Sequence, residues 1–168
     1  MTYNSFEELP VWQQAAELYE QTDEFLEHAP SRIRPSFKDQ LERAVLSVSN
    51  NIAEGFERGS TKELLQFIYI ARGSAGEVRS MLAVVLRRPW AKQFSPEISQ
   101  LKSKALNCSR QLHGWAQSLQ NTDIQGPRYL NQATRERYEQ KRRAIECKKR
   151  LLENLPANHP LRKQKSEF

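Results

Sequence analysis

The fold class is decided by the stretch SFKDQLERAVLSVSNNIAEGF, residues 36–56. Its apolar side chains recur every three or four residues, which is the spacing of one face of an α-helix. They are Phe37, Leu41, Ala44, Val45, Val48, Ile52 and Phe56. Ser36 is expected to cap this helix, with Asp39 three residues later, and Gly59 is expected to end it. The spacing therefore predicts an amphipathic helix that buries one face.

The same spacing continues on both sides of this stretch. Ser60 and Glu63 form a capping-box pattern, so we expect a third helix almost without a loop, closed by Pro89. A first helix is expected to begin near Pro10 and a fourth at Ser95. Four helices of about 20 residues joined by short links predict an all-α fold, an antiparallel up-down four-helix bundle.

A break at Gly126-Pro127 separates a C-terminal segment of a different kind. A fifth helix is expected beyond it, but between residues 133 and 144 Tyr138 is the only sizeable apolar side chain. So thin a stripe suits a helix that lies on a surface, on a neighbouring subunit or on a ligand. We predict a four-helix bundle over residues 1–126 and, over residues 127–168, a basic helical extension with a loosely ordered C-terminus.

Charge is distributed unevenly along the chain, whose net charge is +6. Residues 5–28 hold seven acidic side chains and no basic one, whereas residues 29–126 hold 14 Lys and Arg against 8 Asp and Glu. Residues 127–168 add 12 Lys and Arg against 5 Asp and Glu. A basic middle and a basic tail favour a polyanionic partner such as nucleic acid.

Several classes of protein do not fit the sequence. A membrane-spanning helix needs about 20 apolar residues, and no stretch approaches that length. The N-terminus has neither the basic start nor the apolar run of a signal peptide. Cys108 and Cys147 do not have a paired spacing, so we expect reduced thiols and a cytoplasmic location.

The sequence also carries no pattern typical of an enzyme. His28, His113 and His159 are scattered and lack partners at metal-ligand spacing. The glycines at residues 73 and 76 interrupt a helical pattern and follow no strand, unlike a phosphate-binding loop. No Glu-x-x-His pair occurs, which a di-metal bundle site requires. We therefore predict no catalytic site, no metal and no cofactor.

Small and polar residues interrupt the second and third helices at Asn51, Gly55, Gly73 and Gly76. A glycine inside a helix costs about 1 kcal/mol relative to alanine, so these positions need a reason. We favour close helix contact. The alternative is that another subunit or a phosphate backbone approaches there. Asn51 is expected to satisfy a helix end or a neighbouring carbonyl rather than to read a base.

Four motifs around these residues resemble one protein family. They are Phe6-x-x-Leu9-x-Val11-Trp12-Gln13-x-Ala15, Gln40-Leu41-x-Arg43-Ala44, Asn51-Ile52-Ala53-Glu54-Gly55-x-x-Arg58 and Phe67-x-x-Ile70-Ala71-Arg72-Gly73-Ser74-x-x-Glu77. Over residues 6 to about 119 the chain resembles the bacterial four-helix-bundle family of the large-subunit ribosomal RNA intervening-sequence protein. That family is distantly similar to the accessory variability determinant of diversity-generating retroelements, which partners a reverse transcriptase.

The resemblance implies an antiparallel four-helix bundle that assembles into a homopentamer and binds nucleic acid. Many members of the family stop near the end of the fourth helix, whereas this chain continues to residue 168. The resemblance therefore says little about the segment that carries most of the excess charge.

Candidate phosphate contacts come from the bundle and from the tail. Lys141-Arg142-Arg143 and Lys148-Lys149-Arg150 are seven residues apart, so they lie on the same side of a helix. The nucleic-acid-binding candidates are Arg43, Arg58, Lys62, Arg72, Arg79, Arg87, Arg88, Arg135, Lys141, Arg142, Arg143, Lys148, Lys149 and Arg150. An oligomer repeats these contacts, and their affinity falls with salt as counterions are released. Tyr129 and Tyr138 could stack on unpaired bases, although we favour packing onto the bundle.

Other interpretations of the tail remain open. It could be a solvated helix held by i,i+4 pairs such as Glu139 with Arg143 and Glu146 with Arg150. It could also serve a protein-interaction scaffold, gripping an acidic protein or the acidic first helix of a neighbouring subunit. A partner of a reverse transcriptase would combine both roles. The unpaired surplus of cations favours a non-enzymatic, oligomeric adaptor that binds RNA or DNA.

Overall fold

The structure, a computed structural model, describes residues 3–29, 32–120, 140 and 143–152. The described residues contain helices and no strand, so the predicted all-α class is confirmed. The chain divides into two compact units, Met1–Arg128 and Tyr129–Phe168, and each is described by itself. The predicted boundary between residues 126 and 127 lies outside the described residues. So does most of the predicted fifth helix, of which residues 140 and 143–152 are helical.

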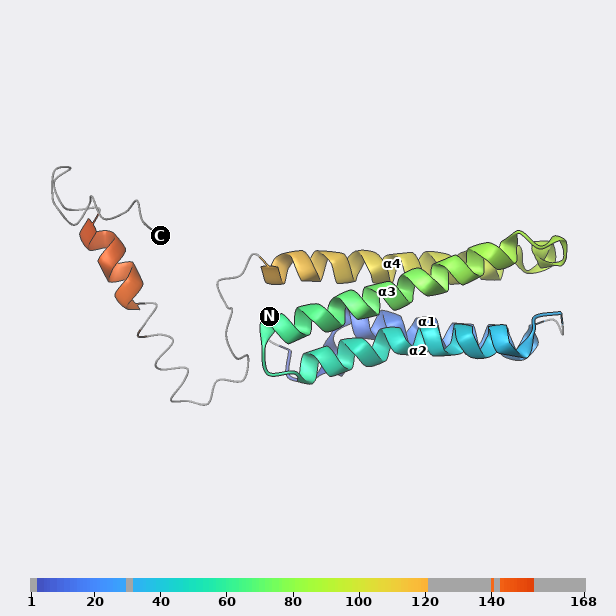
Figure 1. Cartoon of the computed structure of the whole chain (residues 1–168), viewed down its shortest axis with the longest axis horizontal. Helices are drawn as coiled ribbons and strands as arrows, with labels where there is room; N and C mark the ends of the chain where they lie inside the picture. The colour runs from blue at the N-terminus through green and yellow to red at the C-terminus, as the bar shows by residue number, and fades with distance from the viewer. Residues whose placement is uncertain (1–2, 30–31, 121–139, 141–142, 153–168) are drawn as a thin grey trace. The chain divides into compact units, whose positions relative to one another are not determined.

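Four long helices build the first unit and lie alongside one another (Figure 1). They are α1 (Pro10–His28), α2 (Pro35–Glu57), α3 (Thr61–Leu86) and α4 (Ser95–Gln120). The largest contacts are those of α3 with α2 and α4, and α1 packs against the same two helices. Two short 3-10 helices, η1 (Phe6–Glu8) and η2 (Pro89–Phe94), precede α1 and α4. The sequence pattern predicted the four long helices but neither short one, because three to six residues are too few to show a period.

The starts of α2 and α3 differ in whether a side chain caps the helix. At α3 the Ser60 Oγ accepts a hydrogen bond from the Glu63 backbone N at 3.3 Å, as the capping-box pattern predicted. The Ser60 hydroxyl also donates to Glu63 Oε2 at 2.6 Å. The prediction that Ser36 caps α2 is wrong. The helix begins at Pro35, and its N-cap Arg34 makes no side-chain cap bond. Proline tolerates the first helical turn because its missing N–H has no partner there.

The core lies where the apolar faces of the four helices meet. Six of the seven apolar residues predicted for the α2 stripe are buried, and the seventh, Phe37, is partly buried. Fully buried Leu18, Ile68 and Leu112 come from the three other helices. Each such side chain contributes about 1.5–3 kcal/mol on burial. None of the described helices has the length and apolarity to cross a membrane.

Candidate nucleic-acid interface

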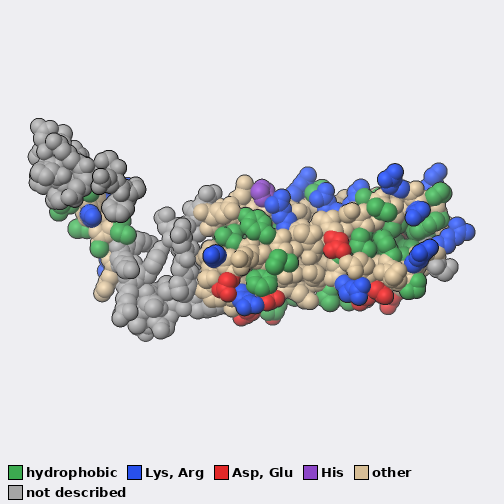
Figure 2. All heavy atoms as spheres, viewed as in Figure 1, with side chains coloured by type: hydrophobic (Ala, Val, Ile, Leu, Met, Phe, Trp, Pro, Cys, Tyr) green, Lys and Arg blue, Asp and Glu red, His purple; other side chains and the backbone are tan. Residues whose placement is uncertain are grey.

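Charge divides the bundle between its first and second pairs of helices. Residues 1–60 carry 11 Asp and Glu against 5 Lys and Arg, whereas residues 61–120 carry 9 Lys and Arg against 3 Asp and Glu. Figure 2 shows Lys and Arg gathered along the edge where α4 lies and at one end of the bundle, with Asp and Glu mostly toward the opposite edge. The bundle therefore has an acidic half, α1 with α2, and a basic half, α3 with α4.

The outer surface between α3 and α4 carries part of the basic charge. Arg72 and Arg79 are seven residues apart on α3, so both lie on the same side of that helix. The Arg72 Nη1 lies 3.4 Å from the His113 Nδ1 of α4, which places this side against α4. Arg110, one turn before His113, is exposed. We call these four residues the α3–α4 surface. The single carboxylate of α4, Glu97, lies in its first turn.

Three other candidate residues of the bundle differ in whether another side chain already binds their charged group. Arg58 forms an ion pair with Glu54, and its guanidinium lies 5.1 Å from the centre of the Phe67 ring. Arg43 donates a 3.1 Å hydrogen bond to a neighbouring glutamine side chain, and Lys62 is exposed. Because a carboxylate already neutralises Arg58, its charge is the least available of the three.

Five exposed cations gather at one end of the bundle, in and beside the links that precede α2 and follow α3. They are Arg32, Arg34, Arg87, Arg88 and Lys92, which we call the basic end. Across the part of the chain that the structure describes, none of them has an ion pair. Sequence reasoning identified Arg87 and Arg88 but missed the other three. Their proximity arises because the link before α2 and the link after α3, which are separated by the whole of both helices, meet at one end. No local sequence pattern reports this.

Three residues of the basic end line a pocket of about 580 Å³ between the start of α2 and the end of α3. Arg32, Arg34 and Arg88 line it together with apolar side chains that include Phe37 and Trp90. No carboxylate lines it. This basic-end pocket is therefore suited to an anion that also has an apolar part.

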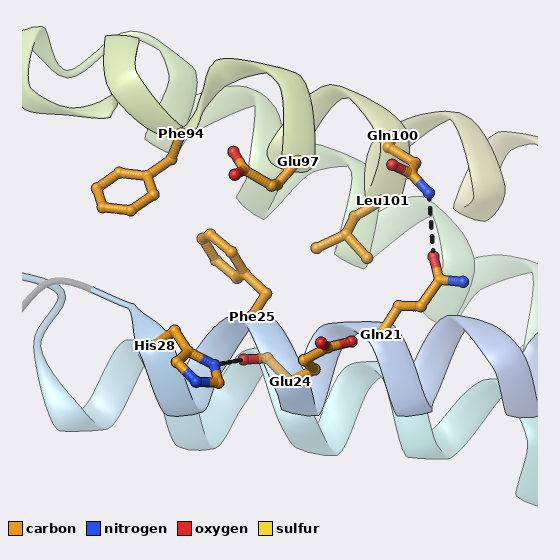
Figure 3. A pocket seen from close by; sticks show the side chains of 8 residues that line it. All are labelled: Gln21, Glu24, Phe25, His28, Phe94, Glu97, Gln100 and Leu101. Carbon is orange, nitrogen blue, oxygen red and sulfur yellow. Dashed lines mark hydrogen bonds between the residues drawn. The ribbon is translucent and has the colours of Figure 1, made fainter.

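A second groove lies at the same end, between α1 and α4, and has the opposite charge (Figure 3). It measures about 430 Å³ and is lined by Glu24, Glu97 and His28, beside the rings of Phe25 and Phe94. The two rings pack edge to face with centroids 6.4 Å apart, and His28 Nδ1 lies 2.9 Å from the backbone oxygen of Glu24. No group of three potential metal ligands was found here or elsewhere among the described residues. Two carboxylates at this acidic groove disfavour phosphate.

The described part of the tail is an exposed helical segment. Lys148 and Lys149 are exposed, and Arg150 pairs with Glu146 at 3.1 Å, as one of the two predicted i,i+4 pairs requires. Arg143 is also exposed. The remaining predicted tail residues lie outside the described residues: Arg135, Lys141, Arg142, Tyr129, Tyr138 and Glu139. An exposed pair of this kind contributes at most about 1 kcal/mol, so it holds Arg150 only weakly.

One known protein family matches most of the bundle. A family model described as the 23S rRNA-intervening sequence protein matches residues 7–114. The chain belongs to this family. The match covers α1, α2, α3 and most of α4, and it confirms the resemblance seen in the four sequence motifs. Among curated proteins none matches the chain. The basic tail lies outside the family match.

Within the family-matched region the glycines divide into two kinds. Gly55 is buried, and a Cβ built on it would lie 2.6 Å from the Phe67 Cβ, so α2 and α3 are in close contact there. At Gly73 and Gly76 a Cβ would meet no atom of the described chain within 4 Å. Close helix contact within the chain is therefore the wrong explanation for these two glycines. The approach of another subunit or of a phosphate backbone stays a prediction.

An exposed seam runs between α2 and α3 of this family member. Ser47 Oγ and Ser74 Oγ lie 3.0 Å apart across the two helices, and Asn51 Nδ2 donates to the Ser47 backbone oxygen at 2.7 Å. Asn51 thus satisfies a neighbouring carbonyl, as expected. One turn before Ser74, Ile70 is 50% exposed. We call Ser47, Ile70 and Ser74 the α2–α3 seam.

Proposed function

We propose that this member of the 23S rRNA-intervening sequence protein family is a non-enzymatic, oligomeric adaptor that binds nucleic acid, with RNA as its ligand. The observation that carries the proposal is the separation of charge within the bundle, which leaves nine basic residues against three acidic ones over residues 61–120. The family's name refers to ribosomal RNA, which favours RNA over DNA.

Phosphate binding follows from where the cations stand. The five residues of the basic end are exposed and without ion pairs among the described residues, and Lys148 and Lys149 of the tail are exposed. Each cation that meets a phosphate releases a condensed counterion, so several weak contacts add to a salt-dependent affinity. Cations scattered in this way favour binding to the phosphate backbone of the RNA without sequence specificity.

Self-association is the second part of the proposal, with five subunits as the family resemblance implies. Ile70 exposes apolar surface along the α2–α3 seam, and the space beside Gly73 is open to a neighbour. The acidic and basic halves of one bundle are complementary to those of the next, which favours a ring built from two different faces. Each phosphate contact would then occur once per subunit.

The proposal also includes finer features of architecture and location. We infer an antiparallel up-down order of the four helices, with the basic helical extension attached after residue 126. We infer a cytoplasmic location because Cys108 and Cys147 are both free thiols.

The test is a titration of fluorescein-labelled RNA with the full chain at several salt concentrations. Single-stranded U12 and a short hairpin are the probes, and fluorescence anisotropy gives the affinity. Replacing Arg72 and Arg79 by Gln, or Lys148 and Lys149 by Gln, is expected to lower the slope of log K against log salt. The loss for single strands is about 0.7 per phosphate contact removed.

The matched control removes two cations that carboxylates already neutralise. Lys104 pairs with Glu17 at 3.0 Å and Arg58 pairs with Glu54, so Lys104→Gln with Arg58→Gln changes the net charge equally. This control should bind nearly as well as the unmodified protein. If the unmodified protein fails to bind either RNA at low salt, the proposed function is wrong.

A protein-interaction scaffold is the second candidate, and one observation favours it. Ile145 and Leu151 of the tail helix are 70% and 53% exposed, which is unusual for apolar side chains on a helix that only meets phosphate. A reverse transcriptase encoded by a neighbouring gene would be such a partner. Co-purification of the two proteins that is lost with Ile145→Asp and Leu151→Asp, while RNA binding is unchanged, would favour this candidate.

A further inference from the structure

The basic-end pocket combines features that a solvated patch of charge does not have. It is a concavity of about 580 Å³, within the range of roughly 300–1,000 Å³ that small-molecule sites occupy. Residues from the start of α2, the end of α3 and η2 line it together. It therefore lies at a junction that only the folded bundle creates.

The rim of this pocket is positively charged. Arg32, Arg34 and Arg88 are exposed around it and have no ion pair among the described residues. The first turn of α2 contains no acidic residue, so the partial positive charge of that helix start is not cancelled there. Guanidinium groups bind phosphate oxygens with paired hydrogen bonds.

The floor of the pocket is apolar. Phe37 and Trp90 are partly buried and line it, and Val84 lines it with half of its surface exposed. A simple phosphate would leave this apolar floor unused. A nucleobase is a flat ring that packs on such side chains, and its own phosphates stand within reach of a basic rim.

The acidic groove at the same end of the bundle offers a comparison for the charge of the rim. Both concavities have aromatic side chains, Phe37 and Trp90 in one and Phe25 and Phe94 in the other. They differ in the charged groups, which are three arginines in one and Glu24, Glu97 and His28 in the other. The apolar floor alone would accept any flat ring, whereas the arginines select one that carries phosphate.

We propose that the basic-end pocket binds one unpaired nucleotide of a single-stranded RNA. The base lies against Trp90, Phe37 and Val84, and the flanking phosphates contact Arg32, Arg34 and Arg88. This inference rests on the proposed function, because it assigns a site to a nucleic acid that the bundle is proposed to bind. It goes further by predicting a preference for unpaired bases over duplex.

The experiment compares two variants that each add one carboxylate to an exposed position of α3. Val84→Glu places it in the pocket, whereas Gln66→Glu places it five turns away on the same side of the helix. Both positions are exposed, so both variants should fold, which circular dichroism checks. Fluorescein-labelled U12 and an abasic strand with the same number of phosphates are titrated against each full-length protein.

We expect the unmodified protein to bind U12 about tenfold more tightly than the abasic strand, the range that base stacking supplies. Val84→Glu should lower the affinity for U12 about tenfold and abolish this preference. Gln66→Glu should change both affinities less than twofold. In a parallel experiment, U12 that contains 4-thiouridine should crosslink under ultraviolet light to peptides containing Trp90 or Phe37.

The outcomes separate the pocket from the proposed function. If the unmodified protein binds neither strand, nucleic-acid binding is wrong and the pocket assignment falls with it. If it binds U12 but the two variants behave alike, or if crosslinks map only to the tail, the pocket assignment alone is overturned. Binding of a deca-glutamate peptide that Val84→Glu abolishes, without crosslinking of U12 in the pocket, would assign the site to an acidic protein segment and overturn the nucleotide.

Discussion

At Gly55 the missing side chain lets two helices approach each other. A Cβ there would lie 2.6 Å from the Phe67 Cβ and 3.3 Å from the Leu64 Cδ1, both on α3. The sequence showed that each glycine in α2 and α3 costs helix stability, but it gave no sign that Gly55 differs from Gly73. That difference depends on which face of α2 meets α3, which is a property of packing and not of local sequence.

Replacement of Gly55 by Ala is expected to cost the bundle about 2–3 kcal/mol, because the added methyl overpacks the contact with Phe67. Alanine's better helix propensity, about 1 kcal/mol, offsets only part of this cost. Urea unfolding at one fixed protein concentration measures the change. Gly73→Ala is the control, since its Cβ meets no atom of the described chain within 4 Å. Equal stability of the two variants would contradict the close contact at Gly55.

The thiol of Cys108 is a second residue whose behaviour follows from burial. Its side chain is fully buried, and burial raises its pKa to about 11 from 9.0. The folded state thus holds this proton over a pH range in which the unfolded chain has lost it. The stability that the neutral thiol contributes is complete below pH 9 and is lost as the pH rises toward 11.

We expect the free energy of unfolding to fall by about 1 kcal/mol between pH 8 and pH 10 through this thiol alone. Cys108→Ala lacks the titrating group, so its stability should fall less over the same interval, which urea titrations at the two pH values measure. Parallel pH profiles for the two proteins would show that the thiol does not titrate as its burial predicts.

At the scale of helices, the sequence predicted the side-chain cap at the start of α3 but misplaced the start of α2, which has no side-chain cap. Ser60 and Glu63 bond to each other at the start of α3, as their spacing indicated. Ser36 makes no such cap, because α2 begins at Pro35. A capping box is recognised from a pattern of two side chains. Proline is a separate signal, and Pro35 marks the start of α2 just as Pro10 marks the start of α1.

Ser60→Ala should therefore cost about 1 kcal/mol of stability, since one backbone N–H at the start of α3 loses its acceptor. Ser36→Ala removes the same hydroxyl from the first turn of α2, where it caps nothing, and is expected to change stability by only a few tenths of a kcal/mol. Thermal unfolding followed by circular dichroism compares them. A larger loss from Ser36→Ala than from Ser60→Ala would reverse this assignment of caps.

At the scale of the whole molecule, the bundle presents an acidic half and a basic half together with the α2–α3 seam. Ile70 lies in the fourth family motif and on the seam, and half of its surface is exposed in the described chain. Exposed apolar side chains flanked by small and polar residues are typical of a site of association. Charge complementarity between the halves then orients one copy against the next.

A carboxylate on this seam is expected to reduce the number of subunits. Ile70→Glu should shift the mass measured by light scattering from the oligomer toward the monomer, because a buried charge without a partner is costly at an interface. Gln111→Glu adds the same charge to an exposed position of α4, away from the seam, and should leave the mass unchanged. A monomeric unmodified protein, or an oligomer insensitive to Ile70→Glu, would contradict an interface at the seam.

Periodicity of the apolar residues was by itself enough to predict the all-α class and four long helices, because the helical repeat is a local property that each segment displays alone. The four motifs likewise identified the family without a structure. The basic-end pocket, the contact at Gly55 and the open space at Gly73 were decided only by tertiary structure. Each depends on which residues of distant helices come together, and Arg32 and Arg88 share a pocket only because the start of α2 lies beside the end of α3.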